Sequence, residues 1–464
     1  MKEASISHFY TSCVETAPYN MNLTTYGFIV TNLTIRSIFT RIPITMYTEN
    51  HKRLKILLGC YACNPNYGSE PGTGWHFMIN IAKYHDVHAI IEEEVGMEDL
   101  LQYKEQHPEE LKNITFHFIR RKRFRLLRKI YPPSYYWTYR HWQKKAYKLA
   151  KELDKKEKFD LVHQITLVGY REPGYLWKLG KPFIWGPLGG FCQTSWCLLR
   201  GLGLYNKIYF GARNILNTLQ KRFSYRVRKA AAAAHSILVS DPQAVEDVKK
   251  IWHKNPTVMR EVGVNLHLLP EKNLSVHAKD TPLRICWSGN LIALKALDLL
   301  LHALALCHQP IRLEVIGKGP KDKEWKQLSS KLGISDKVHF HGFVKHEEAT
   351  LLMSKCHVFC ITSIKEGGTP TVALEALQNG LPLIVLNHCG FASVVKESCG
   401  YKIPLNSRKQ IIEDIAKHLD MLAVDEELRY NLAVGSLHHS RNFTWESKMQ
   451  ILNKIYSDAV KGQM

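Results

Sequence analysis

Short runs of consecutive apolar residues recur along the chain and are separated by loops and longer amphipathic stretches. In the first half, such runs lie at residues 54–59, 87–91, 115–119, 161–165, 183–185, 237–239 and 258–262. Because polar residues do not alternate within most of them, these runs are typical of parallel strands that helices cover on both faces. The pattern predicts an α/β fold in which parallel strands alternate with helices.

The same alternation starts again near residue 281. Strands are predicted at residues 283–288, 312–316, 338–341, 358–361 and 383–386, and helices between them at residues 296–307, 321–332, 346–354 and 370–379. The tail from residue 409 onward is mostly helical in pattern. Two Rossmann-like domains, joined between about residues 263 and 281, explain this restart.

The composition is that of a folded globular chain, and its charge is unevenly distributed. The 464 residues include 63 lysines and arginines against 42 aspartates and glutamates, a net charge of +21. Residues 111–150 contain 12 basic and no acidic residues, and residues 173–240 contain 10 basic and no acidic residues. These two windows account for the whole excess, so they predict an anionic partner such as a membrane leaflet, a phosphorylated substrate or a nucleic acid.

Cysteine spacing and hydropathy bear on where the chain works. The 11 cysteines show no spacing typical of a disulfide framework, which favours a reduced, cytosolic chain. Cys60 and Cys63 form the only C-x-x-C motif, and they follow an apolar run, so we expect structural burial rather than redox or metal chemistry. Residues 26–47 are interrupted by Asn32 and two arginines, so no transmembrane helix is expected there.

The segment from Glu366 to Gly380 combines a glycine pair with strong helix signals. Thr369 suits an N-cap, Pro370 suits the first helical position, and Gly380 suits the residue after the helix. A helix over residues 370–379 is therefore predicted.

Gly367 and Gly368 come directly before that helix, so bare backbone N–H groups and a helix N-terminus converge after a strand. This arrangement favours phosphate binding. Glu375 lies five residues beyond Pro370, about 7.5 Å along the helix, where its carboxylate can accept hydrogen bonds from a ribose. Taken alone, the motif fits a tight turn followed by an exposed glutamate equally well.

Two further loops are expected at the same edge of the second sheet. Lys295 follows the strand at residues 283–288, and Gly317-Lys318-Gly319-Pro320 follows the next strand. Since the carboxyl ends of parallel strands open onto one edge, both lysines can point toward phosphates bound there.

These motifs resemble those of the retaining glycosyltransferases of family 4, which have the GT-B fold. The resemblance covers residues 55–460 and rests on Gly289 to Lys295, Gly317 to Pro320, and the run from Glu375 to Ile384. Residues 185–190, Trp-Gly-Pro-Leu-Gly-Gly, resemble a loop of a bacterial subgroup.

The chain also departs from the family pattern. Asn290 stands where the family has arginine, and Ala296 stands where it has glycine. Eight residues separate Glu366 from Glu375, where the family has seven. One cation is thereby missing at the expected diphosphate site. Either the loop bulges by one residue, or Glu366 is not the counterpart of the family's first glutamate.

The resemblance implies transfer of a hexose-type sugar from a nucleotide diphosphate sugar to an acceptor hydroxyl, with retention at the anomeric carbon. It implies no metal and no cofactor beyond the nucleotide sugar as co-substrate. The catalytic residues that it implies are His163, Glu366 and Lys295. The donor-binding residues that it implies are Gly72, Asn290, Lys295, Lys318, Phe343, Gly367, Gly368, Thr369 and Glu375. For His163 the alternative is a histidine whose ring is satisfied by other groups of the protein.

The sequence pattern and the resemblance together divide the chain into four parts. We expect residues 1–50 to be a weakly structured extension and residues 51–265 to be an N-terminal, acceptor-side Rossmann-like domain. Residues 266–425 are expected to be a C-terminal nucleotide-sugar donor domain. Residues 426–464 are expected to form C-terminal helices that pack back toward the N-terminal domain.

The basic window near residue 120 has three interpretations. Its cationic and apolar side chains, with aromatic residues following, are Arg121, Arg123, Phe124, Leu127 and Arg128. We favour a membrane or acceptor patch at the membrane interface, which suits a lipid-linked acceptor. A solvated basic face with buried aromatic residues is the plain alternative. Nucleic-acid binding is the third, although no nucleic-acid-binding module accompanies the patch.

The sequence therefore predicts a cytoplasmic enzyme, peripheral at the inner face of the cell membrane, in surface polysaccharide or glycolipid synthesis. Its expected partners are a nucleotide-sugar donor, a glycan or lipid-linked acceptor and an anionic membrane surface, with no nucleic acid. Two alternatives stay open: a glycan- or partner-binding protein with a degenerate donor site, and a basic nucleic-acid-binding protein.

Overall fold

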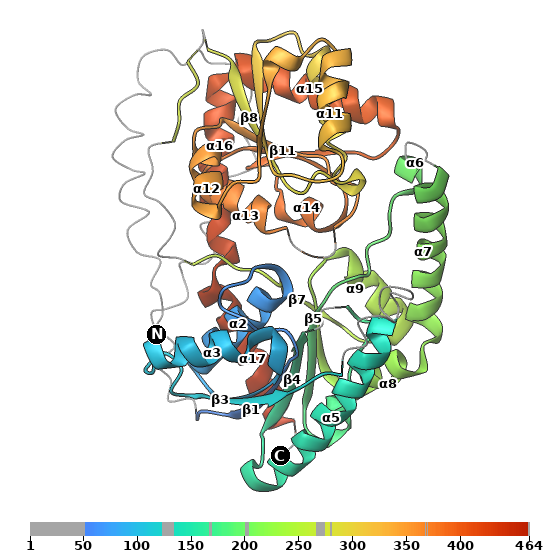
Figure 1. The fold of residues 1–464 in the computed structure, drawn as a ribbon, viewed down its shortest axis with the longest axis vertical. Coiled ribbons are helices and arrows are strands. Elements are labelled where there is room, and N and C mark those ends of the chain that lie inside the picture. Colours follow the sequence, from blue (N-terminus) through green and yellow to red (C-terminus); the bar gives the residue numbers. More distant parts are fainter. Residues whose placement is uncertain are drawn as a thin grey trace, which may run out of the picture. The chain divides into compact units, whose positions relative to one another are not determined.

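The computed structural model describes residues 52–122, 134–166, 169–199, 204–265, 274–278, 281–366, 368 and 370–462 (Figure 1). Arg53–Met464 form one compact unit. The extension expected at residues 1–50 lies outside the described residues. Within the part of the chain that is described, no helix is both long and apolar enough to cross a membrane.

The first sheet has seven parallel strands in the order β3-β2-β1-β4-β5-β6-β7. Its strands are β1 (Lys55–Cys60), β2 (Asp86–Glu92), β3 (Ile114–Ile119), β4 (Leu161–Thr166), β5 (Phe183–Leu188), β6 (Ala234–Val239) and β7 (Thr257–Val258). The helices of this part are α2 (Ser69–Ala82), α3 (Glu93–Gln106), α5 (Ser134–Glu157), α6 (Trp196–Leu199), α7 (Leu204–Phe223), α8 (Tyr225–Ala233) and α9 (Gln243–Asp247). Ile56 and Leu58 join one core cluster and Leu57 joins another, so both faces of the sheet are covered.

The second sheet has six parallel strands in the order β10-β9-β8-β11-β12-β13. Its strands are β8 (Leu283–Ser288), β9 (Ile311–Ile316), β10 (Val338–Gly342), β11 (Val358–Ile361), β12 (Leu383–Leu386) and β13 (Gly400–Ile403). The helices that follow its strands are α10 (Leu297–Leu306), α11 (Asp322–Lys331), α12 (His346–Ser354), α13 (Thr371–Gln378) and α14 (Cys389–Val394). One hydrophobic cluster, which includes Trp287, Leu300 and Leu374, joins this sheet to its helices.

The predicted α/β class with two Rossmann-like domains is confirmed, and every expected strand has a counterpart. Three details differ. β7 contains only Thr257 and Val258, although the Met259 amide still donates to the Val239 carbonyl oxygen at 2.8 Å. The short strand β13 was not expected. Pro370 has extended backbone and precedes α13, whereas it was expected to be the first helical residue.

Three helices end the chain: α15 (Arg408–Val424), α16 (Glu426–Ser440) and α17 (Trp445–Lys461). α17 packs against the first sheet, where Trp445, Leu452 and Tyr456 belong to the same cluster as β1. α16 does not pack toward the first sheet as expected. Its buried Arg429 donates hydrogen bonds to the carbonyl oxygens of His357 and Ser275, which tie α16 to the second domain.

Candidate donor site

The loops that follow β8, β9 and β11 hold one another through their backbones. The Gly289 amide donates to the Ile316 carbonyl at 2.9 Å, and the Leu291 amide donates to the Lys318 carbonyl at 3.1 Å. The Ile364 amide donates to the Leu294 carbonyl at 2.9 Å. The expectation that these three loops meet at one edge of the second sheet is therefore confirmed.

Close approach of these loops requires glycine at two positions. Gly317 has φ +138°, and a Cβ there would lie 2.0 Å from the Gly289 carbonyl oxygen. A Cβ at Gly319 would lie 2.5 Å from the Leu291 carbonyl oxygen. The Gly-Lys-Gly-Pro motif thus allows two loops to touch backbone to backbone, which places the Lys318 stem at the sheet edge.

Lys295 and Glu366 form an ion pair at this edge. Both side chains are largely buried, with 17% and 18% of their surface exposed. The Thr362 hydroxyl donates to the carbonyl oxygen of Ala296 at 2.8 Å and contacts that of Lys295 at 3.0 Å, which fixes the turn carrying the lysine. Ala296 adopts a left-handed conformation, with φ +43° and ψ +44°, at the position where the family has glycine. Two of the residues expected to be catalytic therefore contact each other.

The other expected cation lies on an aromatic ring. The ammonium group of Lys318 is 4.9 Å from the centroid of the Phe343 ring, and Phe343 is 71% exposed. Asn290 is exposed in the loop after β8. An exposed ring beside a cation is a suitable platform for a flat ligand such as a nucleobase.

Glu375 lies on α13 with most of its side chain buried. Burial raises the pKa of its carboxyl group, and the imidazole of His346, 3.9 Å from Glu375 Oε1, acts in the opposite direction. Of the glycine-rich turn before α13, Gly367 and Thr369 lie outside the described residues, whereas Gly368 is described.

A carboxylate that the sequence analysis missed lies against Gly368. A Cβ at Gly368 would be 1.7 Å from Glu261 Oε2, so the glycine gives the carboxylate its space. Glu261 is buried and follows β7. The Lys448 ammonium on α17 donates to the Arg260 carbonyl oxygen at 2.8 Å, and burial holds the pKa of Lys448 well below its usual value while Glu261 opposes that shift. The sequence signal that could have indicated this carboxylate is a single glutamate among basic and apolar residues at positions 258–264.

His163 is not available to a sugar, so the catalytic role expected for it is wrong in this structure. The side chain has no exposed surface, its Nδ1 lies 2.6 Å from the Tyr456 hydroxyl, and its Nε2 lies 2.7 Å from the Gly186 carbonyl oxygen. Burial lowers the pKa of His163 to about 4. A neutral ring that donates from Nε2 and accepts at Nδ1 satisfies both partners. The alternative of a satisfied core histidine fits these contacts.

Gly72 lies in the first turn of α2 rather than in an open loop. A Cβ at this position would be 2.6 Å from the Tyr67 carbonyl oxygen. The Asn64 amide donates to the Pro71 carbonyl at 3.1 Å, and the Asn64 side chain donates to Val95 and Asp99. Gly72 therefore permits a tight turn, and its role in donor binding stays a prediction.

The basic patch expected near residue 120 is only partly described. Arg121 is 6% exposed, and its guanidinium group lies 4.6 Å from the Tyr135 ring centroid and 5.6 Å from that of Tyr61. It cannot face a membrane, because aromatic side chains cover it. The other four patch residues, Arg123, Phe124, Leu127 and Arg128, lie outside the described residues.

The expectation of a fully reduced chain is wrong for one cysteine pair. Cys192, after β5, and Cys389, at the start of α14, form a disulfide. His388 Nε2 donates to the Gln193 carbonyl oxygen at 2.8 Å beside it. Cys60 and Cys63 are free and buried, as expected, and burial raises the pKa of Cys60 to about 12.

Comparison with known proteins gives a family match within the second domain. Residues 271–433 match the family model of glycosyl transferases group 1. Over these residues the second domain resembles this family. The matched segment contains the three interlocked loops, the Lys295–Glu366 pair and Glu375.

One curated relative is the D-inositol 3-phosphate glycosyltransferase of Streptomyces bingchenggensis, 28% identical over 190 residues. That alignment covers 38% of this chain and 40% of the relative, so the match spans less than half of either protein. Among solved structures, Anabaena HepE in complex with UDP covers 88% of this chain and all of its own, with 14% identity and a TM-score of 0.58.

A second solved structure, the lipopolysaccharide outer core galactosyltransferase WaaB in its apo form, covers 89% of this chain and all of its own. It shows 15% identity and a TM-score of 0.59. At this level of identity the two structures establish the fold, and the chain has the GT-B fold.

Proposed function

We propose that this protein is a glycosyltransferase that moves a hexose-type sugar from a nucleotide diphosphate sugar to a hydroxyl of a glycan or lipid-linked acceptor, with retention and without a metal. The observation that carries the proposal is the Lys295–Glu366 pair at the edge where three glycine-containing loops interlock. Similarity to a UDP complex and to a galactosyltransferase supports the choice of donor class.

The chemical problem is the negative charge that develops on the departing diphosphate as the glycosidic bond breaks toward an oxocarbenium-like state. Lys295 and Lys318 would stabilise that charge. In the unliganded site Lys295 is neutralised by Glu366, so the diphosphate would replace Glu366 as its partner. Glu366 would then be free to accept hydrogen bonds from sugar hydroxyls.

Glu261 and Glu375 would contribute in different ways. Glu375 would accept hydrogen bonds from the ribose. The Glu261 carboxylate lies where phosphate oxygens would approach Gly368, so donor binding would require it to turn away or to become protonated. The negative charges of the Glu261 carboxylate and of a bound diphosphate would repel each other beside Gly368, so both could not occupy that space at once.

The proposed setting is the cytoplasmic side of the cell membrane, in the synthesis of a surface polysaccharide or glycolipid. The net charge of +21 supports association with an anionic leaflet. A donor-site-degenerate binding protein is the second candidate, because Asn290 removes one cation and Lys295 is already paired.

The test is a thermal-shift titration of the full chain with UDP, GDP, ADP, CMP and dTDP. A nucleotide at 100 times its Kd adds about 2.7 kcal/mol of stability, which is visible as a higher Tm. Lys295→Ala and Glu375→Ala should abolish the shift. Lys331→Ala and Glu347→Ala, which remove exposed residues of the same domain, should preserve it.

A shift with one nucleotide, lost in both site variants, supports the donor site and identifies the donor base. No shift with any nucleotide would contradict it and favour the degenerate binder. Turnover is then measured as release of the nucleoside diphosphate from its sugar conjugates, and the anomeric configuration of the product is read by NMR. A product with inverted configuration would refute retention.

A further inference from the structure

Helix α7 shows an apolar face that no other part of the described chain covers. We refer to the exposed apolar residues of α7 together as the α7 apolar stripe. Its members are Leu204, Tyr205, Ile208, Tyr209, Ile215, Leu216, Leu219 and Phe223. Each is between 46% and 79% exposed. Over 20 residues the helix is about 30 Å long, so the stripe is a continuous surface rather than a scatter of single side chains.

The opposite face of α7 points into the protein, and three of its four buried positions are polar. The buried positions Phe210, Asn214, Asn217 and Lys221 follow a spacing of four, three and four residues, which places them on one side of a helix. At 100° per residue, the centre of the stripe lies about 180° away from them. The helix therefore reverses the usual arrangement, in which the apolar side faces the core.

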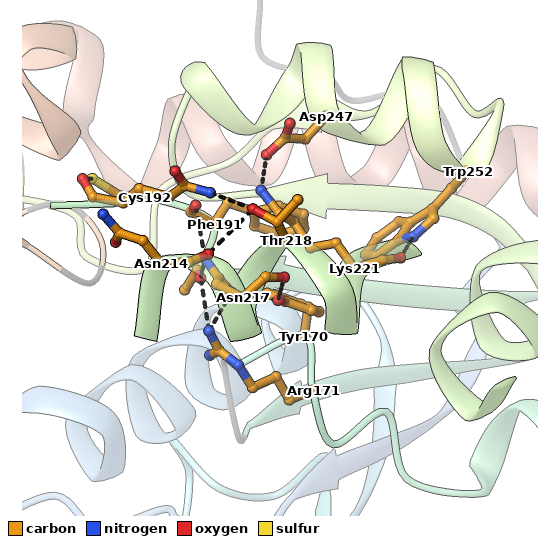
Figure 2. A network of polar contacts seen from close by, with 12 residues as sticks. Tyr170, Arg171, Phe191, Cys192, Asn214, Asn217, Thr218, Lys221, Asp247 and Trp252 are labelled. Carbon is orange, nitrogen blue, oxygen red and sulfur yellow. Dashed lines mark hydrogen bonds and ion pairs between the residues drawn. The ribbon is translucent and has the colours of Figure 1, made fainter. Parts of the chain in front are cut away.

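Hydrogen bonds account for this reversal (Figure 2). The Asn214 side chain donates to the Thr194 carbonyl oxygen at 2.8 Å and accepts from the Thr194 amide at 3.1 Å. Asn217 donates to the carbonyl oxygen of Phe191 at 3.2 Å. Lys221 forms an ion pair with Asp247.

The reversed orientation is thus held by specific polar partners, as Figure 2 shows for the inner side of the helix. Tyr170 and Arg171 also contact the Asn217 side chain. Buried amides and a buried ammonium group would be costly without these partners, so a rotation that hid the stripe would break all of them.

The charged residues around the α7 apolar stripe indicate which kind of partner can cover it. Lys207, Arg213 and Arg222 are exposed on α7, and Arg228 and Lys229 are exposed on α8. Residues 173–240 contain no aspartate or glutamate. A second copy of the chain would therefore bring like charges together across the stripe, whereas an anionic bilayer would supply the opposite charge.

We propose that the α7 apolar stripe inserts into the interface of an anionic lipid bilayer, with the cations of α7 and α8 at the headgroups. Tyrosine and phenylalanine side chains suit the boundary between headgroups and acyl chains. This assigns a surface to the membrane association within the proposed function, and its test does not use donor binding or transfer.

The test is flotation of the full chain with vesicles of phosphatidylcholine alone and of phosphatidylcholine mixed with phosphatidylglycerol. The wild type should partition to the anionic vesicles at least about tenfold more strongly, since each basic residue near the surface adds attraction. The double variant Ile208→Glu/Leu219→Glu should lose at least about tenfold of that partition. Lys207→Gln/Arg222→Gln should lose most of the preference for anionic lipid.

The matched control is Val424→Glu/Ile451→Glu, which places the same charges at exposed apolar positions of α15 and α17, 65% and 45% exposed in the wild type. It should float like the wild type, and circular dichroism should show all variants folded. Absence of wild-type flotation, or equal flotation of Ile208→Glu/Leu219→Glu, would overturn the proposal. A dimer in analytical ultracentrifugation that this variant dissociates would assign the stripe to a second copy instead.

Discussion

His163 should make the protein sensitive to acid through its burial alone. The pKa of its ring falls from 6.5 to about 4 because burial disfavours the charged form. Between these values the unfolded chain binds a proton that the folded chain does not, so stability decreases as the pH falls. A shift of this size corresponds to roughly 3 kcal/mol, at 1.36 kcal/mol for each pKa unit.

The perturbation is His163→Gln, which removes the titrating ring. At neutral pH the variant should be less stable than the wild type, because the Tyr456 hydroxyl and the Gly186 carbonyl oxygen lose good partners. On going to pH 4 the difference should shrink by about 3 kcal/mol, because the variant has no such proton to exclude.

The assay is urea denaturation followed by circular dichroism at a series of pH values, with unfolding free energies from linear extrapolation. His107→Gln, at an exposed position, controls for the loss of an imidazole as such. If the unfolding free energies of wild type and His163→Gln change with pH in parallel, the reasoning is refuted. The ring would then take up its proton as readily in the folded protein as in the unfolded chain.

Three further predictions concern stability. The double variant Cys192→Ser/Cys389→Ser should lose up to about 5 kcal/mol, since the disulfide joins residues 197 apart, and denaturation with and without reductant will check this. Gly317→Ala should cost more than about 2 kcal/mol and weaken nucleotide binding, whereas Gly333→Ala, which is strained but meets no neighbour, should cost only about 1 kcal/mol; equal Tm losses would contradict this. Ala296→Gly should raise the unfolding free energy by up to about 1 kcal/mol, because the φ of Ala296 is +43°. A lower Tm of this variant would contradict the left-handed conformation of Ala296.

The strands were predictable because each is a local signal: a buried parallel strand is rich in consecutive apolar residues. β13 escaped because Tyr401 and Lys402 interrupt its four residues, and only pairing with β12 makes it a strand. The meeting of the donor loops was also predictable, since it follows from the parallel order of the strands. The strands and the meeting of the loops could thus be predicted from local sequence patterns and their order along the chain.

What could not be predicted depends on partners distant in the sequence. Whether His163 is free or satisfied depends on Tyr456, 293 residues later. Arg121 belongs to a strongly basic run, and only its contacts with Tyr61 and Tyr135 show that it is buried. The orientation of α7 likewise follows from hydrogen bonds that its own pattern does not reveal.

A short series of side-chain contacts connects α7, which carries the apolar stripe, to the donor site. Phe210, on the inner face of α7, lies 5.7 Å from the ammonium group of Lys365, whose pKa burial lowers to about 8. The next residue, Glu366, pairs with Lys295. A helix that docks on a bilayer through its outer face would thus carry the donor loop on its inner face. Under the proposed function, that arrangement would bring a lipid-linked acceptor close to the sugar donor, which gives a physical reason for exposing so much apolar surface on α7.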